Sequence, residues 1–233
     1  FGFTGTLDGS KTHKWVLEGL FGECEQVTKT DDLIKDGYLS KFRIKVLLCK
    51  HAPQHFESYH DEMEYLVEHK GRNNLIKNLV NDLEGNTLVL FNYVEKHGEP
   101  LYELINSTID PERKLFFVHG GTDVEDREEV RQITETESNA IIVASYGTFS
   151  TGINIKRLHN IVFASPSKSR IRNLQSIGRV LRKGEGKDIA TLYDIADDIG
   201  GQNYTLKHLN ERVNIYNDEN FKYEVIKVNL RAS

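Results

Sequence analysis

The sequence predicts an α/β fold in which a parallel β-sheet is covered by helices on both faces. From residue 86 onward, short apolar segments alternate regularly with amphipathic segments of ten or more residues. The apolar segments, such as Thr87–Phe91 and Asn139–Ser145, are nearly continuous, which is typical of strands buried on both faces. Ligands of such sheets bind beyond the carboxyl ends of the strands, so the loops 92–98, 119–123 and 145–154 are the expected site.

The first part of the chain is less regular. Residues 1–6 resemble the end of a strand before a glycine turn, and His13–Phe21 has the spacing of a short amphipathic helix. Residues 31–35 begin with two aspartates, which favour a short capped helix. Phe42–Leu48 alternates apolar residues with Arg and Lys, which predicts a strand.

The remaining elements follow from the same two periodicities. Runs rich in β-branched and aromatic residues indicate strands, and apolar residues repeated every three or four positions indicate helices. Helices are expected at 54–69, 72–84, Val94–Asn106, Glu125–Thr134, Ser167–Arg182 and Thr205–Asn217, with Gly71 between the first two. Strands are expected at Thr87–Phe91, Leu115–Val118, Asn139–Ser145, Asn160–Ala164 and Ile189–Ile195, with Tyr223–Val228 as an edge strand.

Charge and composition restrict the kind of function. The 233 residues carry a net charge of −5, so a nucleic-acid site would have to be a local patch. One basic patch has Glu185 as its single acid and comprises Lys168, Arg170, Arg172, Arg179, Arg182, Lys183 and Lys187. With no signal peptide, no long apolar run and no Cys-x-x-Cys pair, we expect a reduced, cytoplasmic setting and no membrane contact. Because the first residue is not Met, we expect a piece of a longer protein.

The segment Gln175–Gly184 has the pattern of a helix with two faces. Gln175, Arg179 and Arg182 share one face, at spacings i, i+4 and i+7. Gly178 costs helix stability, which indicates that something approaches the helix closely there. Two guanidinium groups and an amide could clamp phosphate oxygens, although spacing alone favours a solvated basic face. Another face, suited to packing on a sheet, gathers Ile171, Leu174, Ile177 and Leu181.

The sequence contains no complete P-loop. At Gly5–Thr12 the Lys-Thr pair is present, but Ser10 stands where the second glycine belongs, and a side chain there hinders close approach of a phosphate. Gly186 and Lys187 fail as well, because Asp188 follows them. A bound nucleotide would therefore take only part of its site from this chain.

Five blocks of the sequence resemble, in order, motifs of superfamily two helicases. Phe3-Thr-Gly-Thr-Leu7 resembles motif III, Thr87–Tyr93 motif IV, Phe117–Gly121 with Arg127 the following His-Gly block, Ser145–Asn154 motif V, and Gln175-Ser-Ile-Gly-Arg-Val-Leu-Arg182 motif VI. Each block alone is weak evidence, but their order over residues 1–182 makes the combination specific. Within the family, the chain resembles phage helicases that remodel branched DNA during recombination.

The resemblance implies a RecA-like fold. Residues 1–42 would be the end of a first motor domain and a connector, and residues 43–233 would be the second motor domain. Such helicases hydrolyse ATP with Mg²⁺ between two motor domains, and the first domain would supply most of the nucleotide site. The match to motif VI implies that Arg179 and Arg182 act on the γ-phosphate as arginine fingers, with Gln175 supporting the contact.

Further site residues are also implied by the resemblance. Gly152, Asn154 and Gly178 are expected near the nucleotide, although the family often has Asp where Asn154 stands. The nucleic-acid side is expected to comprise Asn92, His119, Gly120, Ser145, Tyr146, Thr148, Thr151, Lys168, Arg170 and Arg172. Several alternatives remain open. Ser145, Tyr146 and Thr148 also suit a tight turn, His119 suits a structural turn, and the three basic residues suit solvent.

Three other clusters have less specific patterns. Asp194, Asp197 and Asp198 resemble a catalytic acidic cluster but fit better as residues that end a strand and cap the next element. Glu62 and Glu64 are expected on a solvated helix face. No metal site is expected, because no common closed zinc site has the spacing of Cys49, His51, His55 and His60.

We therefore predict the C-terminal part of an ATP-dependent DNA helicase or translocase that acts as a monomer. The branched substrates (forks, Holliday junctions and D-loops) and roles in recombination, repair and replication restart come wholly from the resemblance. The alternatives are an RNA helicase, a non-unwinding DNA translocase with the same motor, and a RecA-like binding module without catalysis. The chain alone is expected to have no ATPase activity, because it lacks a P-loop.

Overall fold

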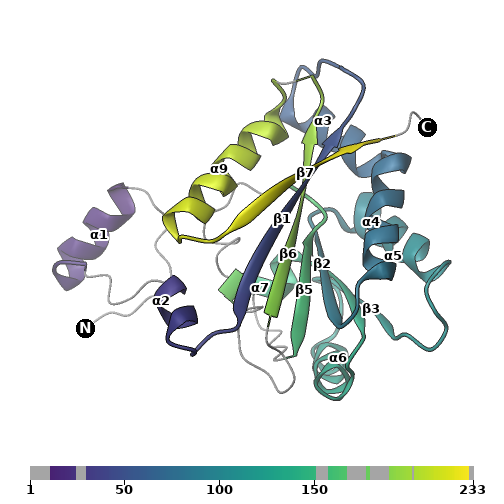
Figure 1. Cartoon of the computed structure of the whole chain (residues 1–233), viewed down its shortest axis with the longest axis horizontal. Helices are drawn as coiled ribbons and strands as arrows, with labels where there is room; N and C mark the ends of the chain where they lie inside the picture. Colours follow the sequence, from purple (N-terminus) through teal and green to yellow (C-terminus); the bar gives the residue numbers. More distant parts are fainter. Residues whose placement is uncertain are drawn as a thin grey trace.

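The computed structural model describes residues 11–24, 30–150, 157–166, 177–178, 189–200 and 202–230. A seven-stranded sheet has the order β3-β4-β2-β5-β6-β1-β7, and every adjacent pair is parallel. All carboxyl ends therefore lie at one edge of the sheet (Figure 1). The strands are β1 (Lys41–Lys50), β2 (Asn86–Phe91), β3 (Leu115–Val118), β4 (Ile141–Ser145), β5 (Leu158–Phe163), β6 (Ile189–Asp198) and β7 (Tyr223–Asn229).

Helices cover both faces of the sheet. Successive residues of a strand point to opposite faces, so Leu88 of β2 enters one core cluster and Val89 enters the other. The helices α4 and α5 pack into the Val89 cluster, whereas α9 packs into the Leu88 cluster. The described helices are α1 (Lys11–Phe21), α2 (Thr30–Lys35), α3 (Tyr59–Glu68), α4 (Lys70–Asp82), the π-helix η1 (Val94–Gly98), α5 (Glu99–Asn106), α6 (Val124–Thr136), α7 (Tyr146–Ser150) and α9 (Tyr204–Asp218).

The predicted parallel α/β sheet is confirmed, and β7 is its edge strand. The helix expected from residue 54 begins only at Tyr59, after the cap residue Ser58, whose Oγ accepts from the N–H of Asp61 at 3.2 Å. The break expected at Gly71 falls at His69, because His69 Nδ1 caps the next helix. Two further differences lie at the carboxyl edge. The helix expected from Val94 starts as the π-helix η1, and the loop expected after β4 starts as the short helix α7.

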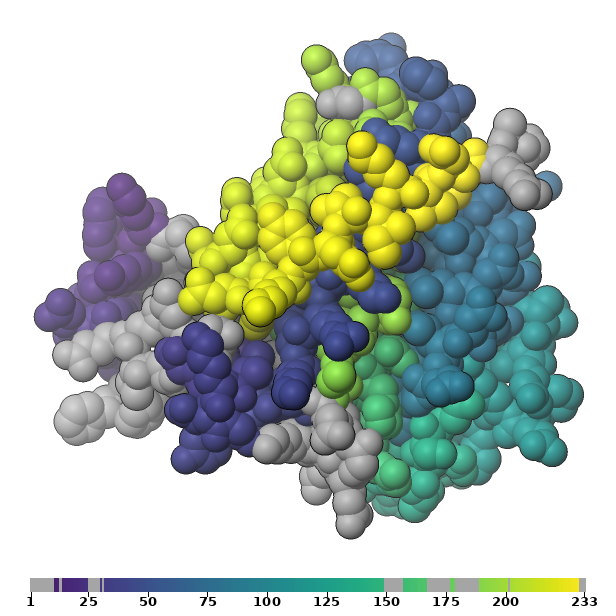
Figure 2. Space-filling view, viewed as in Figure 1, coloured from purple at the N-terminus to yellow at the C-terminus, as the bar shows by residue number. Residues whose placement is uncertain are grey.

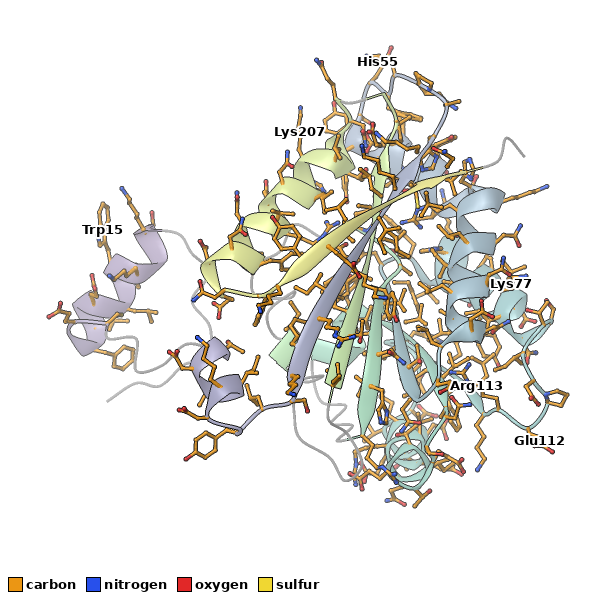
Figure 3. The ribbon with its side chains drawn as sticks, in the orientation of Figure 1. Trp15, His55, Lys77, Glu112, Arg113 and Lys207 are labelled. Carbon is orange, nitrogen blue, oxygen red and sulfur yellow. The ribbon has the colours of Figure 1, made fainter. Side chains whose placement is uncertain are left out.

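The segments before β1 meet the sheet differently. The helix α2 and the turn after it pack against the core through Ile34 and Leu39, and Thr30 Oγ1 donates to Glu219 Oε2 at 2.9 Å. In contrast, α1 stands apart from the sheet (Figures 1 and 2). Its Trp15 side chain projects away from the body of the protein and is 67% exposed (Figure 3). Together with Trp15, an apolar surface on α1 is formed by Val16, Leu20 and Phe21.

Candidate functional site at the carboxyl edge of the sheet

The carboxyl edge of the sheet has two parts with different chemistry. We define the inner edge as the carboxyl ends of β3, β4, β2 and β5, and the outer edge as those of β6, β1 and β7. At the inner edge, His119 follows β3, Ser145 ends β4, Asn92 follows β2 and Ser165 lies just beyond β5. The fold thus brings the predicted loops together with a segment that the sequence did not single out. None of these four side chains is a carboxylate, a lysine or an arginine.

Asn92 joins the loop after β2 to the segment after β5. Its backbone N–H donates to Ser165 Oγ at 3.2 Å, and its side-chain Nδ2 donates to the carbonyl of Pro166 at 3.3 Å. Asn92 is half-buried, whereas Ser165 and Pro166 are buried. The chain continues from Pro166 towards the segment that resembles motif VI. The predicted DNA-side residue Asn92 is therefore bonded to the two residues that follow β5 and precede this segment in the chain.

The loop after β2 continues as the π-helix η1, in which the N–H of Gly98 donates to the carbonyl of Tyr93 at 2.8 Å. The His97 ring is buried, and its Nδ1 lies 2.9 Å from Ser165 Oγ. Burial, and then the charge of Arg72, lower the pKa of His97 to about 3, so the ring is neutral at pH 7. Single π turns occur frequently at functional sites. The sequence pattern did not identify His97, because the pattern alone predicted an α-helix there.

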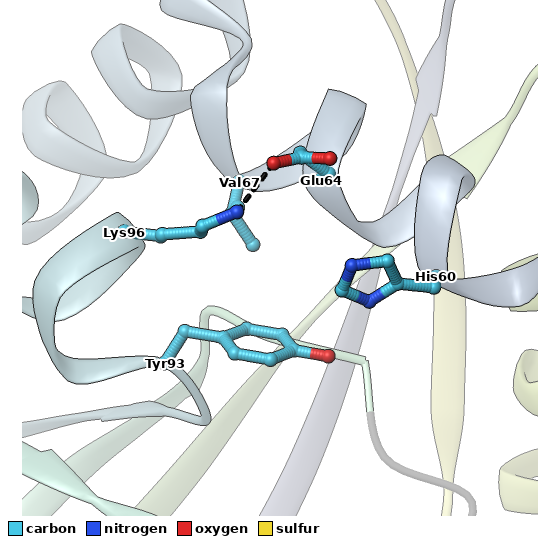
Figure 4. A pocket seen from close by; sticks show the side chains of 5 residues that line it. All are labelled: His60, Glu64, Val67, Tyr93 and Lys96. Carbon is cyan, nitrogen blue, oxygen red and sulfur yellow. Dashed lines mark hydrogen bonds and ion pairs between the residues drawn. The ribbon is translucent and has the colours of Figure 1, made fainter.

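The π-helix is fixed on both sides. A Cβ atom at Gly98 would lie 2.5 Å from the Phe91 ring, so only glycine permits this close packing. On the other side, Lys96 forms an ion pair with Glu64 of α3 (Figure 4). A small hollow lies between α3 and η1, beside the Asn92 loop. Glu64 and Lys96 line it together with His60, Val67 and Tyr93.

The segment resembling motif V begins with a buried turn. Ser145 Oγ and Thr148 Oγ1 lie 2.8 Å apart, and the N–H of Thr148 donates to Ser145 Oγ at 3.3 Å. The Tyr146 side chain is 2% exposed, and its hydroxyl donates to the carbonyl of Ser165 at 3.2 Å. A phosphate contact of the Tyr146 side chain is therefore contradicted, since a buried ring cannot reach a nucleic-acid backbone. The side chains of Ser145 and Thr148 form the tight turn that was the alternative.

His119 also organises a turn. Its N–H donates to Thr122 Oγ1 at 3.0 Å, and its Nδ1 accepts from the N–H of Gly121 at 3.2 Å. Arg127 holds the same turn, since its Nε donates to the carbonyl of Thr122 at 2.8 Å. Gly120 is exposed, and an added Cβ there would meet no described atom within 4 Å. The structure thus realises the structural alternative for His119, and contacts of His119 and Gly120 with nucleic acid remain predictions.

Only Ile177 and Gly178 are described in the segment that resembles motif VI. Ile177 is 1% exposed and belongs to the core cluster on the α9 face, in agreement with the predicted apolar helix face. Gly178 is exposed, and a Cβ atom there would meet no described atom within 4 Å. The described part of the chain therefore does not require glycine at position 178. Close approach of another group to this position remains a prediction. Outside the described residues lie Thr151, Gly152, Asn154, Lys168, Arg170, Arg172, Gln175, Arg179 and Arg182.

The outer edge carries charged side chains that are paired within the protein. Asp197 of β6 accepts from Arg72 Nε at 2.9 Å and lies 2.9 Å from His51 Nε2. These three side chains are fully buried, and Asp198 forms an ion pair with Lys50. Burial alone would raise the pKa of Asp197, but Arg72 and His51 lower it to about 2. These contacts explain the charged cluster as part of the core.

A second buried pair lies on the opposite face of β6. Asp194 Oδ2 accepts from Arg212 Nε at 2.8 Å and from the Tyr216 hydroxyl at 2.8 Å. The prediction that Asp194 and Asp197 end a strand and cap the next element is wrong, because both lie inside β6 and pair with arginines of α9 and α4. A catalytic role of this acidic cluster is not supported either, because the carboxylates of Asp194 and Asp197 form ion pairs within the protein.

Glu62 provides a fourth carboxylate in this region. The prediction of a solvated face is wrong for Glu62, which is 1% exposed. Its carboxylate accepts from the N–H groups of Tyr204 and Thr205, each at 2.7 Å, and so caps the first turn of α9. The sequence could not reveal this contact, because it joins residues 142 and 143 positions apart.

Comparison with known proteins identifies the fold family. Residues 71–184 match the family of helicase conserved C-terminal domains. The ATP-dependent DNA helicase UvsW of Enterobacteria phage T4 is 35% identical over 252 residues, which cover 99% of this chain and 49% of UvsW. Residues 71–184 belong to the helicase C-terminal domain family. The whole chain spans about half the length of UvsW.

Solved structures agree with this assignment to the helicase C-terminal domain family. The crystal structure of T4 UvsW matches with a TM-score of 0.68 at 32% identity, over 95% of this chain and 46% of that one. A DEAD box protein from Methanococcus jannaschii matches with a TM-score of 0.52 at 15% identity, over 82% of this chain and 43% of that one, and so shares the fold. The sheet is therefore the RecA-like sheet of a helicase C-terminal domain. Among the described residues, no helix is long and apolar enough to cross a membrane.

Proposed function

We propose that this chain is the second motor domain of an ATP-dependent DNA helicase that acts as a monomer on branched DNA. Forks, Holliday junctions and D-loops would be its substrates, in recombination, repair and replication restart. The similarity to T4 UvsW over almost the whole chain supports DNA as the substrate. The observation that carries the proposal is the convergence of Asn92, Tyr146 and the segment 165–166 at the inner edge.

On the DNA side, the inner edge offers the amide of Asn92 and the imidazole of His119, and neither Ser145 nor Ser165 adds a competing carboxylate. Neutral donors can bind phosphate oxygens without repelling them, and such contacts position a strand without reading its sequence. The half-buried Asn92 and His119 would face the strand. The buried Tyr146 would support the loop from within. Positive charge would come from Lys168, Arg170 and Arg172.

On the nucleotide side, ATP with Mg²⁺ would be held mainly by the first motor domain. The described residues contain no group of three or more His, Cys, Asp or Glu suited to a metal ion. Of the two described residues of this segment, Ile177 is buried and Gly178 is exposed. Arg179 and Arg182 on an outward face would stabilise negative charge on the transferring phosphoryl group, with Gln175 beside them. Gly152 and Asn154 would complete this side.

The exposed helix α1 supports an arrangement with two domains. Trp15, Val16, Leu20 and Phe21 are between 54% and 70% exposed, and several large exposed apolar side chains on one short helix indicate a contact site. The first motor domain would cover this surface. Since α2 is already packed on the sheet, the connector would lie between α1 and α2.

The test is ATP hydrolysis by the intact protein with and without branched DNA. Arg179→Ala and Arg182→Ala are each expected to lower ATP turnover by about 10³-fold or more, because an arginine finger stabilises the transition state. Arg179→Lys should fail similarly, since lysine lacks the planar, bidentate group. Binding of DNA should remain within about threefold, because these side chains contact nucleotide rather than DNA.

Lys77→Ala provides the control, since it removes a positive charge from α4, away from the carboxyl edge (Figure 3). It should leave both ATP turnover and DNA binding unchanged. Near-normal turnover in both Arg179→Ala and Arg182→Ala would exclude the finger assignment. Stimulation by RNA or by unbranched duplex equal to that by branched DNA would exclude the proposed substrate.

A further inference from the structure

We propose that Ser165 is a positioning residue that couples DNA binding at the Asn92 loop to ATP hydrolysis. The inference rests on the proposed function, and it assigns a role to a residue outside all of the helicase-like motifs. Ser165 lies just beyond β5, at the centre of the inner edge. The role follows from which elements its atoms connect.

Ser165 contacts three elements that follow neighbouring strands. Its Oγ accepts from the N–H of Asn92 at 3.2 Å, and the same Oγ lies 2.9 Å from His97 Nδ1 in η1. Its carbonyl accepts from the Tyr146 hydroxyl of α7 at 3.2 Å. Its own N–H donates to the carbonyl of Leu90 in β2 at 3.3 Å. One residue thus joins the loops after β4, β2 and β5, which lie next to one another in the sheet.

The Ser165 hydroxyl joins the Asn92 loop to η1 inside the protein. Ser165 Oγ accepts from the N–H of Asn92 at 3.2 Å and lies 2.9 Å from Nδ1 of the buried His97 ring. The tautomer of His97 decides which atom of the second contact is the donor. In either tautomer the hydroxyl binds both groups, and its removal leaves buried polar groups without this partner.

This arrangement can transmit a displacement. Asn92 is bonded both to Ser165 Oγ and to the carbonyl of Pro166, the residue from which the chain continues to Gln175, Arg179 and Arg182. Ser165 is 0% exposed, so it has no room to move independently of the groups around it. A shift of the Asn92 loop on binding a DNA strand would therefore move the segment 165–166. The same shift would also move Tyr146, at the start of the segment that resembles motif V, because its hydroxyl donates to the Ser165 carbonyl.

The test uses Ser165→Ala in the intact protein. The substitution removes the hydroxyl and leaves the N–H of Asn92 and Nδ1 of His97 without this partner. DNA-stimulated ATP turnover is expected to fall about tenfold, the effect of one buried hydrogen bond on a coupled step. DNA affinity and the turnover without DNA should change less than about threefold, because Ser165 touches neither ligand. Ser165→Cys, which keeps a weaker donor at the same position, should give a smaller loss of stimulation.

Thr87→Val is the matched control. Thr87 is also 0% exposed, and its Oγ1 accepts from Asn160 Nδ2 at 3.2 Å, but it lies at the amino end of β2, opposite Asn92. Its variant should lower the melting temperature as Ser165→Ala does, while stimulation by DNA stays normal. Melting temperatures of all variants show that each remains folded in the assay.

Two outcomes would overturn the inference. One is normal DNA stimulation in a folded Ser165→Ala protein, and the other is an equal loss of stimulation in Thr87→Val. Both would leave the proposed function intact. Absence of DNA-stimulated turnover in the unsubstituted protein would instead contradict the proposed function itself.

Discussion

The two parts of the carboxyl edge differ in the charge and the burial of their polar side chains. At the outer edge, Asp197 and Glu62 are buried, and their charges are satisfied by Arg72 and by the first turn of α9. At the inner edge, Asn92, His119, Ser145 and Ser165 form hydrogen bonds as neutral groups, and Asn92 and His119 are partly exposed. Charge at the outer edge therefore holds the fold together. The inner edge retains the polar surface that a ligand could contact.

The comparison teaches how to separate function from stability among polar residues. The cluster of Asp194, Asp197 and Asp198 resembles a catalytic acidic cluster in the sequence, but two of its members form buried pairs with arginines. The candidate site instead contains inconspicuous residues, such as Ser165, whose importance depends on the three elements it joins. Buried pairs are costly to break, whereas the groups of the inner edge should affect activity more than stability.

Of the proposed substitutions, Arg72→Ala should lower stability most, because it breaks the buried Arg72–Asp197 ion pair at the outer edge. The guanidinium donates to Asp197 at 2.9 Å, and both side chains are 0% exposed, so its removal leaves a buried carboxylate short of its partner. We expect the free energy of unfolding to fall by about 3–5 kcal/mol. Urea unfolding of this chain at pH 7 measures the change.

Arg131→Ala supplies the comparison on α6. Arg131 bonds to Glu128 and Glu135, but these ion pairs are exposed to solvent, so the variant should be much less destabilised. Equal losses in Arg72→Ala and Arg131→Ala would contradict the distinction between buried and surface pairs.

The pH dependence of stability tests the region between the two edges. There, His97 contacts Ser165 of the inner edge and is affected by the charge of Arg72. The folded pKa of His97 is lowered from 6.5 to about 3, so the unfolded chain binds a proton that the folded chain excludes. Stability is therefore fully present above pH 6.5 and is lost as the pH falls towards 3. Between pH 7 and pH 5 the loss from His97 should be about 2 kcal/mol.

His97→Gln keeps a polar side chain that can form a hydrogen bond with Ser165 Oγ, but it does not titrate. Unfolding of both proteins in urea at pH 7 and at pH 5 isolates the contribution of His97, because the other histidines are present in each. The variant should lose about 2 kcal/mol less over this interval. An identical pH dependence of the two proteins would show that His97 is not held neutral.

Much of the fold could be predicted from the sequence, because strands buried on both faces and amphipathic helices leave local patterns. Thr87–Phe91 and Leu115–Val118 are examples, since their predicted limits differ from the observed ones by at most one residue. Less of the site was accessible. The inward direction of Tyr146, the π turn that accompanies His97, and the contacts of Ser165 depend on packing between distant segments. No local periodicity records such contacts.

The strand limits and the paired aspartates show why local features are predictable from the sequence and long-range contacts are not. A strand is recognisable because each residue is buried according to its own place in the repeat. The partner of a buried carboxylate is fixed only when the chain folds, as for Asp197 and Arg72, which are 125 positions apart. The motif blocks located the inner edge. They did not indicate which of its side chains face outward.

The central claim is that the inner edge acts on ATP bound by another domain and responds to DNA. ATP hydrolysis by this chain alone and by the intact protein, each with and without branched DNA, tests that claim most directly. We predict no hydrolysis by the chain alone, which has no P-loop, and DNA-stimulated hydrolysis by the intact protein. Robust hydrolysis by the purified chain alone would contradict the account.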